Sequence, residues 1–128
     1  MTVYCMRYGS LARRFFKIRW GLNGGLVQDH HVIPKQWRNH AAIKRAEYDL
    51  HSSCNLVMMP TPRAMNVMNL RRDRLVHYKG HPNYNKYVKF YLDSMNFIEC
   101  DVKLKDELLD FRDFLKRNCR DNRDLIPW

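Results

Sequence analysis

Two helices in the C-terminal third are the clearest elements that the hydrophobic pattern predicts. From Tyr84 to Met95, apolar residues recur at i, i+3, i+4, i+7, i+8 and i+11, which is the spacing of one helix face. A second apolar stripe runs from Leu104 to Leu115 at four- and three-residue spacing, and Asp101 is placed to cap that helix. Both stripes are typical of helices that pack against a core.

Shorter elements are predicted in the first 74 residues. Residues 26–33 and 54–60 have the pattern of strands, and each run ends at a proline. Residues 10–20, SLARRFFKIRW, predict an amphipathic packing helix with solvated arginines, begun by a serine cap. Residues 36–48 predict a short, weak helix, and residues 61–74 are compatible with a helix that presents arginines. The pattern therefore predicts an α+β fold with little sheet and flanking helices.

Composition places the chain among ordered proteins. Its 128 residues are 45% hydrophobic, which is enough for one domain with its own core and argues against disorder. The four cysteines are scattered and form no CxxC pair, which disfavours a zinc ribbon and suits a reducing compartment. No run has the length of a membrane span, and arginines interrupt the first twenty residues. We therefore expect a soluble intracellular protein of the cytoplasm or nucleus.

Charge is distributed unevenly along the chain, whose formal net charge is +10. Residues 1–90 carry 16 Lys and Arg against 4 Asp and Glu, a net of +12, whereas residues 91–128 carry 7 against 9, a net of −2. A basic body beside a near-neutral tail indicates one face that meets a polyanion. The alternative is a basic surface that serves only solubility.

Four of the six histidines are grouped in two pairs. His30 and His31 are adjacent on a predicted strand, so their side chains point to opposite faces and cannot enter the same core. His77 and His81 lie four residues apart in a turn that leads into the first C-terminal helix. Two imidazoles at a helix entrance and one from a strand can close three sides of a metal site, and they leave room for water and substrate.

Three motifs stand in the order HH…N…H…H: DHHVIP, YDLHSSCNLVMMP and HYKGHPNYNKYV. Together they resemble the HNH endonucleases, also called ββα-metal or His-Me finger nucleases, and most closely their AHH-type branch. The resemblance covers about residues 26–92 and implies a small ββα-metal core of short antiparallel strands and a helix. Residues 1–128 would then form a single nuclease domain, with residues 93–128 as a C-terminal helical extension.

The resemblance also implies roles for the motif residues. His30, His77 and His81 would bind one metal ion, while His31 would activate water as the general base. Asn55 would hold the loop or the ring of His31 by hydrogen bonding, or would bind the metal itself. A strand-end asparagine that only satisfies a turn is the structural alternative.

One position departs from the branch, since Asp29 stands where the AHH motif has alanine. Asp-His is the metal-plus-base pair of other HNH enzymes, so a shifted register is an alternative, with Asp29 as ligand and His30 as base. His40 and His51 match no motif position and are interpreted as surface or structural histidines.

The predicted function is hydrolysis of DNA phosphodiester bonds by nicking, with little sequence specificity; RNA is the other candidate substrate. Magnesium or manganese would support activity, whereas three imidazoles favour zinc or nickel. A homodimer would serve double-strand cleavage, and an inhibitor protein would be needed if the enzyme is a toxin. The competing hypotheses are a non-catalytic nucleic-acid-binding module with a structural zinc and a cationic interaction protein without metal. The residues predicted to hold backbone phosphates are Lys35, Arg38, Arg63, Arg71, Arg72 and Lys79.

Overall fold

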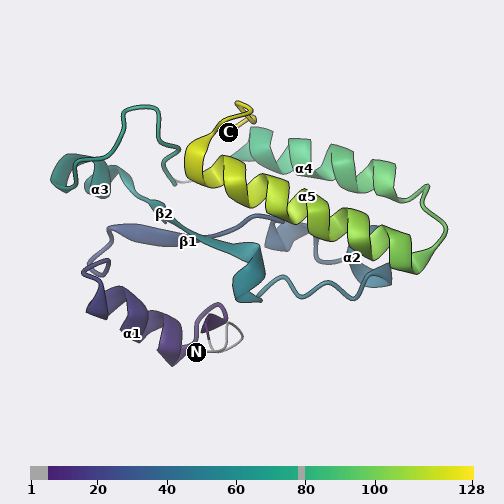
Figure 1. Cartoon of the computed structure of the whole chain (residues 1–128), viewed down its shortest axis with the longest axis horizontal. Coiled ribbons are helices and arrows are strands. Elements are labelled where there is room, and N and C mark those ends of the chain that lie inside the picture. Colours follow the sequence, from purple (N-terminus) through teal and green to yellow (C-terminus); the bar gives the residue numbers. More distant parts are fainter. Residues whose placement is uncertain (1–5, 78–79) are drawn as a thin grey trace.

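A pair of antiparallel strands crosses the middle of the computed structural model, which describes residues 6–77 and 80–128 (Figure 1). Strand β1 (Val27–His31) pairs with β2 (Leu56–Pro60). The remaining elements are α1 (Leu11–Arg19), the short 3-10 turn η2 (Lys35–Trp37), α2 (Ala41–Arg45), the turn η3 (Ser53–Asn55), α3 (Pro62–Val67), α4 (Pro82–Met95) and α5 (Asp101–Asp121). This arrangement confirms the predicted α+β fold, with its small strand pair and flanking helices.

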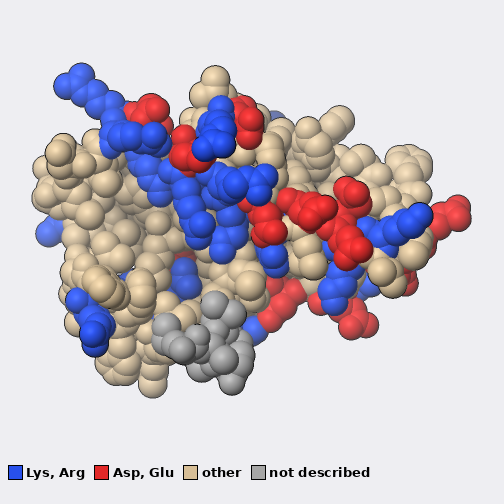
Figure 2. Space-filling model, in the orientation of Figure 1, with Lys and Arg blue, Asp and Glu red and all other residues tan. Residues whose placement is uncertain are grey.

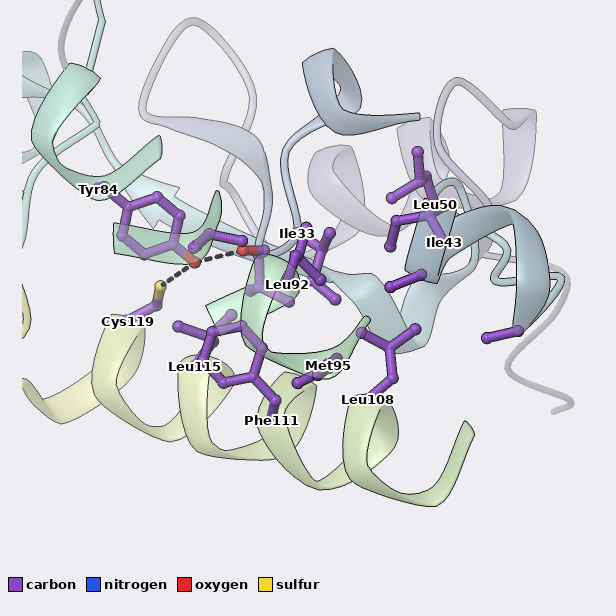
Figure 3. Packing of buried hydrophobic residues seen from close by; sticks show 14 of the residues in the cluster. Ile33, Ile43, Leu50, Tyr84, Leu92, Met95, Leu108, Phe111, Leu115 and Cys119 are labelled. Atoms are coloured by element: carbon purple, nitrogen blue, oxygen red, sulfur yellow. Dashed lines mark hydrogen bonds between the residues drawn. The ribbon is translucent and has the colours of Figure 1, made fainter. Parts of the chain in front are cut away.

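The two C-terminal helices pack side by side, and α5 also packs against β2 (Figure 1). Their predicted apolar stripes face the core except at Tyr91 of α4, which is 38% exposed. Leu92 of α4 and Leu104, Leu108 and Leu115 of α5 are fully buried. Figure 3 shows that residues after β1 join the same core, where the hydroxyl of Tyr84 donates to the backbone oxygen of Val32. This hydrogen bond joins helix α4 to the segment that follows β1.

Three boundary predictions are corrected. Cys100, not Asp101, is the N-cap of α5. Asp101 lies in the first turn, where its negative charge stabilises the helix and its carboxylate accepts a hydrogen bond from Arg45. The helix expected over 36–48 is divided into η2 and α2, because His40 turns the chain and its Nδ1 caps α2 by accepting from Ala42 N at 3.1 Å. Only the first half of the ambiguous segment 61–74 is helical.

Helix α1 begins as predicted, with the Ser10 side chain accepting from the backbone of Arg13. The prediction of an amphipathic packing helix is wrong, however, because Phe15 is 61% and Ile18 is 52% exposed. The buried side chain is instead Arg13, whose Nε lies 2.8 Å from Oδ1 of Asp29 on β1. An ion pair with the sheet, rather than an apolar stripe, sets the side of α1 that faces inward.

Surface charge is divided along α5. Its first half exposes acidic side chains such as Asp106 and Asp110 together with Lys103 and Lys105, while its second half exposes Arg117 and Arg120. Figure 2 shows this division as a red group beside a blue group on the face of Figure 1. Within the described residues, no helix combines the length and apolar character that crossing a bilayer requires.

Candidate metal centre and active site

Three histidines from separate segments converge on one face of strand β1. His30 comes from β1, His81 is the N-cap residue of α4, and His77 lies between them, with its backbone N–H bonded to Pro60 O at the end of β2. One ligand nitrogen from each ring lies within 4.8 Å of those of the other two. The structure therefore brings together the three histidines that the sequence predicted as ligands.

Two amide side chains orient the outer rings of this triad. Nδ1 of His77 lies 2.6 Å from Oε1 of Gln28, and Nδ1 of His81 lies 2.9 Å from Oδ1 of Asn85. An Nδ1–H that donates to each amide oxygen leaves the Nε2 lone pair for a metal, as is common around ligating histidines. Sequence reasoning missed both amides, although Gln28 precedes His30 by two residues on its strand and Asn85 follows His81 by one helical turn.

Burial and mutual repulsion favour the neutral ring at His30 and at His77. Burial, and secondarily the neighbouring His81 and His77, holds the pKa of His30 well below its ordinary value. The pKa of His77 is also lowered by burial and by His81. In addition, Nε2 of His30 is buried and has no hydrogen-bond partner among the described residues. Neutral imidazoles with an unused nitrogen are the form that binds a divalent ion, so this donor set fits one.

Aromatic side chains enclose the inner side of the triad. The ring of Trp128 lies 5.1 Å from those of both His30 and His81, and Tyr84 lies 4.9 Å from His30. Nε1 of Trp128 donates to Val76 O at 3.0 Å and so fixes the residue before His77. Trp128 was not identified from sequence because no local pattern connects it to the histidines.

His31 has a separate set of neighbours, as its place on the opposite strand face requires. Its ring contacts Tyr8 edge-on, with centroids 4.6 Å apart, and its Nε2 lies 3.1 Å from Nδ1 of His51. Burial, with Lys35 and His51 nearby, lowers the pKa of His31 to about 4. The ring lines the same cavity of about 600 Å³ as His30, His77 and His81, so a single bound molecule can contact all four histidines.

Asn55 is fully buried and uses both ends of its amide to join two loops. Its Oδ1 accepts from Ile33 N at 3.0 Å and from the Tyr48 hydroxyl, while its Nδ2 donates to Ile33 O and Leu50 O. It does not line the cavity with the described histidines. These contacts correspond to the loop-holding alternative and leave Asn55 no capacity to bind a metal.

Asp29 is engaged away from the triad. Its carboxylate lies 2.8 Å from Nε of Arg13 and 3.0 Å from Nζ of Lys17, and the side chain is 8% exposed. The described metal-ligating cluster does not include it. The geometry thus favours the register with His30 as ligand over the one with Asp29.

The predicted phosphate-binding residues are dispersed. Lys35 lines the cavity, and Lys17, which was not predicted, lines it as well. The Arg71 side chain reaches Asp121 O at the end of α5. Arg38, Arg63 and Arg72 are exposed and do not line the cavity, and Lys79 lies outside the described residues. The basic stretch of residues 10–20 was the available signal for Lys17.

Comparison with known proteins agrees with this geometry. Residues 23–117 match the model of the AHH family, described as a nuclease family of the HNH/ENDO VII superfamily with conserved AHH. No curated protein and no solved structure was found to match. The matched residues include both strands, the three converging histidines and His31, and they span most of the chain. The chain therefore belongs to the AHH nuclease family of the HNH/ENDO VII superfamily.

Proposed function

We propose that this nuclease is a metal-dependent endonuclease that hydrolyses DNA phosphodiester bonds. The observation that carries the proposal is one cavity lined by the three converging histidines and by His31, which is outside the triad. A divalent ion held by His30, His77 and His81 would stabilise the charge that develops on the scissile phosphate and its leaving oxygen.

The protein's own part in the reaction is proton transfer and positioning. His31 accepts a proton from a water molecule, whose oxygen forms a bond to phosphorus while the bond from phosphorus to the 3′ oxygen breaks. The 3′ oxygen takes up a proton from solvent and His31 releases its proton to solvent, so the products carry a 5′-phosphate and a 3′-hydroxyl. Lys17 and Lys35, which line the cavity, attract the phosphate, and Asn55 joins the segment after β1 to the segment before β2.

The charge distribution supports a nucleic-acid substrate bound through its backbone. Cationic side chains outnumber acidic ones by 16 to 4 in residues 1–90, which contain the four histidines, Lys17 and Lys35 that line the cavity. Contacts with phosphates supply affinity and salt dependence but read no bases. We therefore propose little sequence specificity.

A non-catalytic module with a structural zinc is the competing function. Structural zinc sites are closed by four protein ligands, whereas the cluster of the described chain has three and opens on a cavity. A structural site also needs no additional buried imidazole beside a ligand. His31 is therefore the feature that favours catalysis.

Nicked circles are expected to appear before linear DNA when the protein cleaves a supercoiled plasmid. One metal and one base act on one strand at a time, so two events are needed for a double-strand break. The assay compares magnesium, manganese, zinc and nickel, with a chelator that should abolish cleavage. Raising the salt concentration should weaken cleavage because phosphate contacts are lost. Failure of every metal to support cleavage of DNA or RNA would refute the proposed function.

One metal ion per chain is expected by calorimetry, and His81→Ala should bind it much more weakly. His81 supplies one of only three protein ligands in the described cluster. His40→Ala is the matched control, because His40 caps α2 and contacts Asp93 instead of the triad. Equal stoichiometry and affinity in wild type and His81→Ala would show that His81 is not a ligand.

A further inference from the structure

His51 lies beside the proposed base, although it stands at no position of the HH…N…H…H motif. Its Nδ1 is 3.1 Å from Nε2 of His31, and the two ring planes are nearly perpendicular at 80°. A nitrogen pair at this distance is a hydrogen bond. Twenty residues separate the two histidines in sequence, so the fold creates this pair.

Both the ring and the backbone of His51 have partners, even though the residue is exposed. Tyr8 stacks on it with centroids 5.5 Å apart and planes at 19°, and the backbone N–H of Tyr8 donates to His51 O. The backbone N–H of His51 donates to Oδ1 of Asp49, whose carboxylate is paired with Arg7. An exposed histidine held in this way is positioned for its side-chain contact rather than for packing.

The hydrogen bond has a consequence for which nitrogen of His31 can take a proton. A neutral imidazole has one N–H and one lone pair. If His51 donated to Nε2 of His31, the proton of His31 would sit on Nδ1, and neither nitrogen could accept from water. If Nε2–H of His31 donates instead, Nδ1 keeps its lone pair, and no described residue forms a hydrogen bond with that nitrogen.

We propose, resting on the proposed function, that His51 is a positioning residue that accepts the Nε2–H of His31 and so keeps Nδ1 as the basic nitrogen. When Nδ1 takes the proton of water, Nε2–H stays bonded to the lone pair of His51, which stabilises the imidazolium. The arrangement is one in which a third group orients the base and fixes its tautomer.

Three substitutions at His51 test this role because they differ in the position of the hydrogen-bond acceptor that faces His31. In His51→Asn an amide oxygen can occupy the place of Nδ1, in His51→Gln it lies one bond farther out, and His51→Leu has none. We expect kcat to fall by about 10–100-fold in the Leu and Gln variants, the usual cost of losing an orienting group, and the Asn variant to retain most activity. KM and metal affinity should be unchanged in all three. Leu or Gln variants that cleave at the wild-type rate would overturn the proposal.

A nitrogen NMR measurement on the metal-loaded protein without nucleic acid provides a readout that does not depend on cleavage. The His31 ring should be the Nε2–H tautomer in wild type and His51→Asn, and a mixture of tautomers in His51→Leu. If His31 carries its proton on Nδ1 in wild type, the inference is wrong, whether or not the protein is a nuclease. If no metal supports cleavage, the proposed function fails. The NMR result would still show whether His31 donates the hydrogen bond to His51 or accepts it.

Discussion

Replacement of His31 by alanine is expected to lower the cleavage rate by about 10²–10⁴, the usual contribution of a positioned general base. Metal affinity should stay close to wild type, because the His31 ring contacts Tyr8 and His51 and is not part of the triad. Nucleic-acid binding should also persist, since Lys17 and Lys35 still line the cavity. Single-turnover cleavage, calorimetry with the metal and anisotropy with a labelled duplex measure the three quantities separately.

His40→Ala is the matched control for this substitution. It also removes a largely buried imidazole, whose side chain is 8% exposed, but one that caps α2 and pairs with Asp93. It should cost some stability and leave the cleavage rate per folded molecule unchanged. If His31→Ala releases the metal, its ring is a ligand and the two adjacent histidines have exchanged roles. If it cleaves like wild type, His31 is not the base.

Replacement of His30 by alanine is expected to abolish metal binding and activity together. His30 is the buried member of the triad, and its ring lies beside those of His77 and His81. Its Nε2 has no hydrogen-bond partner among the described residues. Wild type should gain thermal stability when the metal is added, because an ion that binds only the folded state stabilises it. The variant should lose this metal-dependent rise, which calorimetry and thermal melts with and without metal will show.

The same variant decides the register of the motif. Should His30→Ala bind metal normally but fail to cleave, His30 would be the base and Asp29 a ligand. The ion pairs of Asp29 with Arg13 and Lys17 make the opposite result the expected one. Asp29→Asn is a useful companion, because it removes the carboxylate charge with little change of shape. It should weaken the hold of α1 on the sheet and leave the metal stoichiometry at one.

Local regularity explains which features could be predicted. The stripes of α4 and α5 repeat with the period of a helix, and the histidine pair alternates across a strand, so neighbours in sequence were enough to predict their directions. Helix α1 shows the limit of this reasoning. Its boundaries follow from Ser10 and the glycines after it, but its inward side is set by an ion pair with Asp29 on another element.

The sequence by itself determined the family motif, the α+β class, the two C-terminal helices and the four histidines that line the proposed site. Only the tertiary structure decided what surrounds each ring. Gln28 and Asn85 bond to the rings of His77 and His81, Trp128 lies against the triad, and His51 bonds to His31. Motif spacing reports residues that follow one another along a helix or strand. Contacts of Trp128 or His51 depend on how loops return the chain to the same place, and no local pattern encodes that path.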